Sequence, residues 1–321
     1  MDKQSWKKST LSLVLVFASG LLQQNLFAAS DPKIDAVMSD LNAKAESFSD
    51  VRADITFIQK NEGGAEKVIK VRSYTMRAGK LAKNIIVASF PPDLKRISRL
   101  AHGSETGVDE LWVFQPKNRR VKHLSPQSNA TYFLGTEFTM EDWDVQQPQN
   151  LFKYDLRYLS SEGCGEQGEA QTQQCYVIER IPKSKFSGYS RQVMWIDSKL
   201  LRTYRIDFYD KQAVFVKTLR FDDYREYAGK YWRPSVLYMI NKKTGGTTRA
   251  IWTNYQFNNG FVATAFDPIN LDRYSLMQTS LKEDPIDDED AGQLPMEVNQ
   301  MIEASKSILN SLMKAIKSLG N

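Results

Sequence analysis

Between about residues 50 and 260, short runs of alternating hydrophobic and polar residues follow one another, and they predict a chain made mostly of β-strands. Turn signals such as Glu62-Gly63-Gly64 and Pro116-Lys117-Asn118 separate many of these runs. Runs joined by such short turns pair as antiparallel hairpins and not as βαβ units. The predicted strands begin near Arg52, Val68, Leu81, Arg96, Glu110, Arg119, Tyr154, Cys175, Gln192, Leu200, Val214, Tyr231 and Thr247.

Two of the runs place their hydrophobic residues on a single face. In the run 203–208 that face carries Tyr204, Ile206 and Phe208. In the run 215–221 it carries Phe215, Leu219 and Phe221, together with Lys217. Strands of this kind form a sheet with one covered face. A large sheet with few helices then has to close on itself, or wrap around helices or a ligand. The pattern therefore predicts a curved, mainly β (α+β) fold.

Helical periodicity occurs on either side of the strand region. Residues 31–48 are expected to form a helix, with Asp31 as its capping residue and Pro32 at its first position. Its apolar face consists of Ile34, Val37, Met38, Leu41, Ala45 and Phe48. Residues 295–321 are expected to hold an amphipathic helix, after a linker (residues 274–294) that contains the acidic run KEDPIDDED. The stripe of this second helix consists of Val298, Met301, Ile302, Ile308, Leu309, Leu312, Met313, Ile316 and Leu319.

The first 30 residues have the layout of a secretory signal peptide. Lys3, Lys7 and Lys8 precede an apolar stretch from Leu11 to Leu22, and small residues follow at 28–30. The apolar stretch is too short to span a membrane, and residues 1–30 contain no Cys for lipid attachment. We therefore expect a soluble, exported protein whose folded domain covers residues 31–273.

The charge and the cysteine content of the chain exclude few classes of function. The net charge of +5 falls to +3 without residues 1–30, which gives no argument for nucleic-acid binding. Cys164 and Cys175 are the two cysteines of the chain, and in an exported protein they are expected to form one disulfide. Two free thiols are the alternative.

The sequence carries no recognisable catalytic or metal-binding motif. His102 and His123 are not spaced as metal ligands, and no phosphate-binding or nucleophile motif is present, so no cofactor is expected. The stretch FLGTEFTMEDW (residues 133–143) holds three acids, Glu137, Glu141 and Asp142. These could serve acid–base catalysis, but a structural interpretation is favoured. Thr139 can cap a short helical turn, with two of the acids in its first turn, which would lay Phe138, Met140 and Trp143 onto an apolar interior.

Several stretches of the chain together resemble one known family. They are PPDLK (91–95), DELWVFQPKNRRV (109–121), FLGTEFTMED (133–142) and the long run at 189–245. The chain resembles the periplasmic outer-membrane lipoprotein-sorting-protein-like (LolA-like) family over about residues 50–273. The resemblance implies a strongly curved, half-open antiparallel sheet, similar to part of a β-barrel, with helices over its concave mouth. It implies no catalytic residues. The cysteine-bounded loop and the tail after about residue 274 lie outside the resemblance.

The resemblance implies a non-enzymatic periplasmic carrier of a Gram-negative bacterium. Its partners would be the acyl chains of lipids or lipoproteins, an inner-membrane transporter of the resistance–nodulation–division (RND) type, and, transiently, a membrane. An accessory protein or an envelope sensor that binds a protein partner is the alternative, and an enzyme is the last choice. Under the carrier hypothesis, the candidate cavity and lid residues are Phe57, Leu111, Val113, Phe138, Met140, Trp143, Met194, Tyr204, Ile206 and Phe208.

Overall fold

The computed structural model describes residues 32–45, 48–79, 81–105, 108–146, 153–165 and 173–273. The predicted signal peptide (1–30), acidic linker (274–294) and C-terminal helix (295–321) lie outside these residues. Among the helices of the described part, none is long and apolar enough to cross a membrane.

The alternating runs form thirteen β-strands, and each begins within three residues of its predicted start. Every neighbouring pair of strands is antiparallel, as predicted. The strands are β1 (Asp50–Lys60), β2 (Glu66–Ala78), β3 (Leu81–Phe90), β4 (Ser98–His102), β5 (Glu110–Gln115), β6 (Arg120–His123), β7 (Tyr154–Gly163), β8 (Gln174–Pro182), β9 (Tyr189–Asp197), β10 (Thr203–Asp210), β11 (Phe215–Tyr227), β12 (Tyr231–Asn241) and β13 (Thr247–Phe257).

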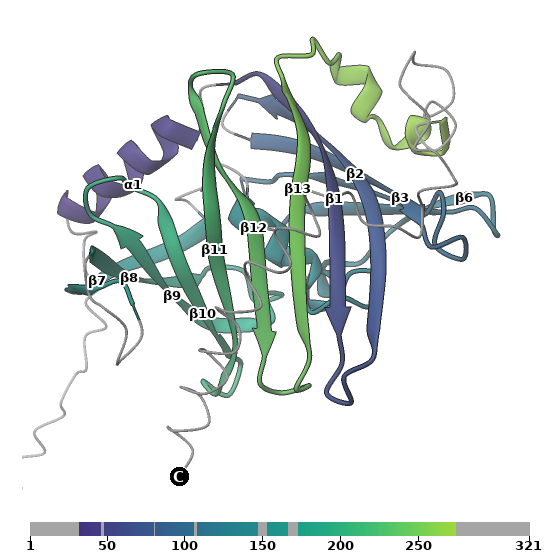
Figure 1. Cartoon of the computed structure of the whole chain (residues 1–321). Coiled ribbons are helices and arrows are strands. Elements are labelled where there is room, and N and C mark those ends of the chain that lie inside the picture. Colours follow the sequence, from purple (N-terminus) through teal and green to yellow (C-terminus); the bar gives the residue numbers. More distant parts are fainter. Residues whose placement is uncertain are drawn as a thin grey trace, which may run out of the picture.

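All thirteen strands belong to one curved, open sheet (Figure 1). Its strand order is β6-β5-β4-β3-β2-β1-β13-β12-β11-β10-β9-β8-β7. The first and last of these thirteen strands pair in the middle of the sheet, where Ile55 lies opposite Trp252. In contrast, β6 and β7 are consecutive in the sequence but form the two opposite edges of the sheet. The chain between them therefore has to pass from one edge to the other.

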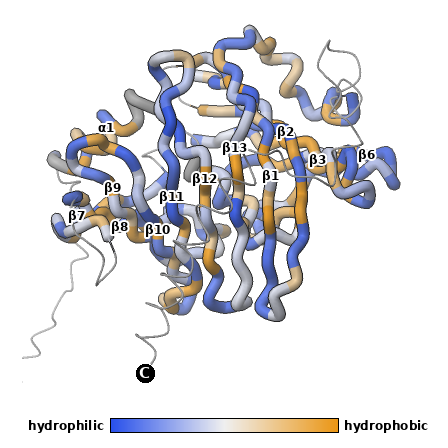
Figure 2. Tube along the Cα trace, in the orientation of Figure 1, coloured by the Kyte–Doolittle hydropathy of each residue, from blue (hydrophilic) through white to orange (hydrophobic). Residues whose placement is uncertain are grey.

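The main hydrophobic core lies on the concave face of the sheet. Because successive side chains of a strand point to opposite faces, alternate residues such as Ile55 and Phe57 of β1 enter this core together. Leu237 and Met239 of β12 enter it in the same way. Hydrophobic residues are concentrated in the middle of the central strands, whereas the hairpin turn between β1 and β2 is hydrophilic (Figure 2).

A single α-helix, α1 (Pro32–Ala45), packs on this core among the described residues. Ile34 and Met38 are almost completely buried, and Val37 and Leu41 pack beside them, so the predicted apolar face is confirmed for these four residues. Phe48 lies beyond the helix, contrary to the prediction that it belongs to the helical stripe. Its ring packs against Tyr231 and Phe257, with centroids 5.9 Å and 5.4 Å away.

The opposite face of β2–β5 is also covered, which the prediction of a single buried face did not anticipate. Short 3-10 helices, η4 (Ala263–Phe266) and η5 (Pro268–Asn270), lie after β13, and Phe266 and Leu271 join a second core cluster. Ile85 and Val87 of β3 belong to this second cluster, whereas Ile86 between them belongs to the concave core. The unbroken apolar run of β3 is the sequence signal for burial on both faces.

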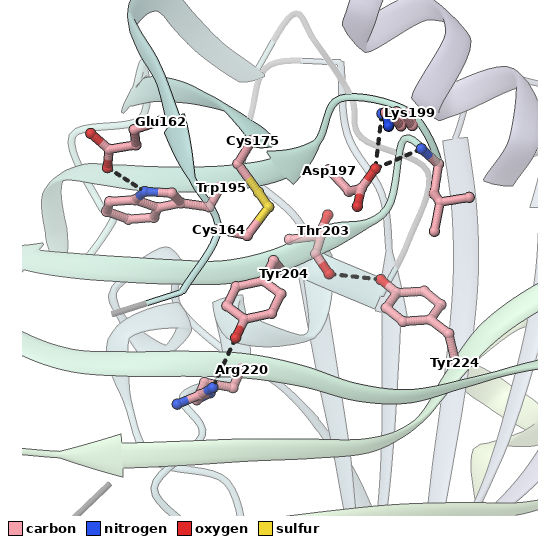
Figure 3. Close-up of a disulfide and its surroundings, with 11 residues drawn as sticks. Glu162, Cys164, Cys175, Trp195, Asp197, Lys199, Thr203, Tyr204, Arg220 and Tyr224 are labelled. Atoms are coloured by element: carbon pink, nitrogen blue, oxygen red, sulfur yellow. Dashed lines mark hydrogen bonds between the residues drawn. A yellow bond between two sulfur atoms is a disulfide. The ribbon is translucent and has the colours of Figure 1, made fainter. Parts of the chain in front are cut away.

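A disulfide closes the β7–β8 hairpin on the convex face of the sheet (Figure 3). Cys164 and Cys175 are bonded and buried, which confirms the predicted pair. They pack with Trp195, whose indole N–H donates a 2.8 Å hydrogen bond to Glu162. We call Cys164, Cys175, Val177, Val193 and Trp195 the disulfide cluster.

Candidate functional site

The residues that follow β6 lie across the concave face of the sheet, and we call residues 124–146 the crossing segment. Near one edge, the Asn129 amide donates to the carbonyl of Asp109, just before β5. Further along, the Glu137 N–H donates a 2.9 Å hydrogen bond to Thr248 Oγ1 of β13. Glu141 accepts a 2.7 Å hydrogen bond from the N–H of Gly188, beside β9. The crossing segment is therefore attached to both halves of the sheet.

Local sequence explains the shape of this segment. Phe133 N–H donates to Phe138 O at 2.8 Å, which closes a tight loop between them. Gly135 supplies the bend with φ of +79°. The predicted helical turn is present as the 3-10 helix η2 (Met140–Gln146).

The cap of this turn differs from the prediction. Asp142 makes the side-chain cap, because its carboxylate accepts a 2.6 Å hydrogen bond from the Thr139 N–H. The Thr139 hydroxyl points instead to the Tyr189 hydroxyl, 3.3 Å away.

Three aromatic residues of the crossing segment fill the concave face. Phe133, Phe138 and Trp143 surround Phe57 of β1, with ring centroids 6.4 Å, 6.2 Å and 5.7 Å from it. Trp143 also lies 6.4 Å from Trp252 of β13. Phe138 and Trp143 are buried, so the predicted placement of these two side chains on an apolar interior is confirmed.

A buried ion pair fixes the segment to the sheet. Lys217 Nζ of β11 lies 2.6 Å from Asp142 Oδ2, and the two side chains are 3% and 0% exposed. The Tyr189 hydroxyl donates a 2.8 Å hydrogen bond to Asp142 Oδ1. Burial, together with the negative charges of Asp142 and Glu141, raises the pKa of Tyr189 well above its usual value, so this hydroxyl stays a donor. The buried charge of Asp142 is therefore balanced by Lys217, and its oxygens accept hydrogen bonds from neighbouring groups.

The other two acids of the segment are also held by hydrogen bonds. Glu137 accepts a 2.7 Å hydrogen bond from the side-chain amide of Asn241. Gly246 lies so close to the Glu137 carboxylate that a β-carbon at this position would force the Glu137 side chain to shift. Burial, and then the negative charge of Asp142, raise the pKa of Glu141 to about 7. All three acids therefore have structural partners.

The histidines lie on the other side of the sheet from these acids. His102 Nε2 is 2.7 Å from the carbonyl of Phe266, and burial lowers the pKa of the imidazole. The rings of His102 and His123 both lie 4.8 Å from Trp112, which packs on the second core cluster. Neither histidine shares a site with the carboxylates of the crossing segment.

A pocket of about 870 Å³ opens between the crossing segment and strands β4–β6, and we call it the β6 pocket. Pairing between the strands places Arg99, Val113 and Lys122 side by side in one row. Gln115 and Arg120 form the next pair on the same face. Phe133, Leu134 and Met140 of the crossing segment also line the pocket.

The ten predicted cavity and lid residues fall into different surroundings. Val113 and Met140 line the β6 pocket. Leu111 is buried on β5, two residues before Val113 and hence on the same face. The concave core takes in Phe57, Phe138, Trp143, Met194, Ile206 and Phe208.

Tyr204 departs from the predicted face. It packs on the disulfide cluster, and its hydroxyl accepts a 3.1 Å hydrogen bond from Arg220 (Figure 3). A register shift between Thr203 and Arg205 interrupts the alternation, which separates Tyr204 from Ile206 and Phe208.

A family model described as "-like: Uncharacterized protein" matches residues 80–273, more than half of the chain. A solved domain from Vibrio parahaemolyticus, named for outer membrane lipoprotein sorting, is 29% identical with a TM-score of 0.66, and the match covers 74% of this chain and 97% of that one. A LolA superfamily protein from Nitrosomonas europaea is 16% identical with a TM-score of 0.59, with 75% of this chain and 98% of that one covered. This chain belongs to the LolA-like family.

Another solved LolA-like fold carries a different family name. A DUF1329 family protein from Desulfovibrio piger is 24% identical with a TM-score of 0.67, and the match covers 76% of this chain and 100% of that one. Among curated proteins, none matches this chain.

Sequence reasoning missed several residues of the site in this LolA-like protein. It placed Lys217 on an apolar strand face but did not assign it a partner. A cation among Leu219 and Phe221 needs a buried acid, so that position was a usable signal for the pair with Asp142. Arg99, Arg120 and Lys122 of the β6 pocket were also missed, because strand pairing and not sequence proximity brings Arg99 beside the other two.

Proposed function

We propose that this protein is a periplasmic, non-enzymatic carrier that binds the acyl chains of lipids or lipoproteins on its concave face. The observation that carries the proposal is the β6 pocket, which is part apolar and joins the covered core at Phe133 and Met140. Its volume of about 870 Å³ lies within the range of ligand sites, roughly 300–1,000 Å³. The disulfide and the signal-like N-terminus support export to an oxidising compartment.

The energetics of an acyl chain suit such a site. Each methylene group removed from water contributes about 0.8 kcal/mol, so burying ten of them contributes about 8 kcal/mol before ordering costs. A carrier needs to cover this surface without altering the cargo. The acids of the crossing segment are engaged in structural hydrogen bonds, which supports a binding role over a catalytic one.

The crossing segment is proposed to act as the lid over a larger binding surface. Phe133 belongs both to the β6 pocket and to the aromatic contacts around Phe57. Lifting the segment would join the pocket to Phe57, Met194, Ile206 and Phe208, which the sequence had marked as cavity wall. In this proposal the described arrangement is the closed state, and the Asp142–Lys217 pair holds it.

The test fills the pocket and measures bound lipid. Val113→Trp places a large ring in the β6 pocket, and Val214→Trp makes the same change at a residue that is 56% exposed. The proteins are purified from the periplasm, and lipid is measured by native mass spectrometry and extraction. We expect acylated species on the wild type and on Val214→Trp, and at least a tenfold loss on Val113→Trp.

Absence of acylated species from the wild type, both as purified and after incubation with vesicles, would refute the carrier function. It would favour the alternative of an accessory protein that binds a protein partner. An RND-type transporter is the partner that the family resemblance suggests, and co-purification with such a transporter would be the corresponding measurement.

A further inference from the structure

The β6 pocket has an uneven distribution of charge. Its lining includes three cations, Arg99, Arg120 and Lys122, and no acidic residue. Arg120 and Lys122 are exposed and lie two residues apart on an edge strand, so their side chains leave the same face about 7 Å apart. Within the described part of the chain, neither of these two has an ion-pair partner.

Arg99 brings a third positive charge to the floor of the pocket. Its side chain is buried, and its guanidinium donates hydrogen bonds to Asn84 Oδ1 at 3.1 Å and to Met140 O at 3.3 Å. It lies in the same row as Lys122, with Val113 between them, so their backbones are about 10 Å apart. The like charges of Arg120 and Lys122 repel each other, and an anion placed between them would relieve the repulsion.

The other wall of the pocket is apolar. Leu134 and Met140 of the crossing segment line the pocket together with Val113 of β5. A site that has apolar residues on one side and cations at the strand edge is complementary to an amphiphile with an apolar chain and an anionic head group. Charge-assisted hydrogen bonds from Arg and Lys to phosphate or carboxylate oxygens are stronger than hydrogen bonds between neutral groups. Arg can donate two of them to the same group.

We propose that the β6 pocket selects an anionic amphiphile. Its acyl chain lies along Val113, Leu134 and Met140, and its phosphate or carboxylate head group lies between Arg120 and Lys122, with Arg99 beneath. This assignment rests on the proposed carrier function and adds the class of cargo. A free phosphate ion would use the cations but would leave the apolar wall uncovered, so the amphiphile is the better fit.

The experiment compares two lipids that differ only in the charge of the head group. Full-length mature protein is incubated with vesicles of phosphatidylglycerol or phosphatidylcholine with the same acyl chains, and the lipid in the protein fraction is measured by native mass spectrometry. The test variant is Arg120→Glu/Lys122→Glu. The control is Lys67→Glu/Lys199→Glu, which changes the net charge equally at exposed positions outside the pocket.

We expect the wild type and the control to take up the anionic lipid about tenfold better than the zwitterionic one, since two exposed charges each contribute up to about a factor of five. The test variant is expected to lose this preference and to keep its uptake of phosphatidylcholine. Equal uptake of both lipids by the wild type, or an unchanged preference in the test variant, would overturn the cargo assignment and leave the carrier function intact. Uptake of neither lipid would overturn both.

A competition experiment separates the lipid head group from free phosphate. Inorganic phosphate at the concentration of the bound lipid is expected to displace none of it. Complete displacement under these conditions would overturn the assignment of an amphiphile.

Discussion

The buried pair of Asp142 and Lys217 gives the sharpest prediction, and the change to make is Lys217→Met. Methionine keeps most of the length of the side chain and removes only the charge and the donor. In the wild type, Lys217 is 3% exposed and its ammonium group lies 2.6 Å from a carboxylate that is 0% exposed. The substitution therefore leaves Asp142 buried without its counter-charge.

The expected loss can be estimated from the contacts that remain. Removing one partner of a buried pair costs about 3–5 kcal/mol in the free energy of unfolding. The Asp142 carboxylate keeps two donors, the Thr139 N–H and the Tyr189 hydroxyl, so we expect a loss near the lower end, about 3 kcal/mol. The double variant Lys217→Met/Asp142→Asn removes the stranded charge and keeps one acceptor for these donors. Its expected loss is about 1–2 kcal/mol.

Urea unfolding at neutral pH, followed by circular dichroism, measures these differences. Lys199→Met is the matched control, because Lys199 is exposed, and its free energy of unfolding is expected to stay within about 0.5 kcal/mol of the wild type. The reasoning fails if Lys217→Met loses less than about 1 kcal/mol. It also fails if the double variant is less stable than the single one.

Three further predictions concern the same segment and the disulfide. Because the folded state raises the pKa of Glu141 from 4.5 to about 7, stability should fall as pH rises between these values, by about 1–2 kcal/mol for this partly buried group. Glu141→Gln should flatten that slope in unfolding measured across pH, and an unchanged slope would assign it to other groups. Trp143→Ala should cost about 3–5 kcal/mol in urea unfolding, since it empties the space between Phe57 and Trp252; a loss below about 1 kcal/mol would mean that the ring packs loosely. Replacing Cys164 and Cys175 by Ala should cost about 3 kcal/mol in thermal unfolding, and a reductant should then have no further effect on the variant.

Strand positions were predictable from the sequence because alternation and turn residues are local signals. The starts of all thirteen strands, the antiparallel hairpins and the disulfide follow from residues near one another in the chain. The face of a side chain was less predictable. One bulge beside Tyr204 was enough to turn that residue toward the disulfide cluster, and no residue in the run 203–208 indicates the bulge.

The candidate site was predictable only in part, because it is assembled across the sheet. The stretch 133–143 could be interpreted as a lid because its own aromatic residues and acids suggested it. Its anchors could not be identified in this way, since Lys217 and Tyr189 lie 75 and 47 positions after Asp142. The order of the strands, which brings these residues together, depends on the pairing of β13 with β1.

The pairing of β1 with β13 has a consequence for how the molecule reaches its folded state. Strands β1–β6 and β7–β13 are two consecutive meanders of hairpins, and the seam between them joins the first strand to the last, with Val51 opposite Phe257. Local hairpins form quickly, whereas so distant a pairing is slow. During synthesis from the N-terminus, β1 has to wait as an unpaired edge until β13 has been made. A chain that ends before Thr247 would leave this edge open to strands of other molecules, so the last strand protects the first from aggregation.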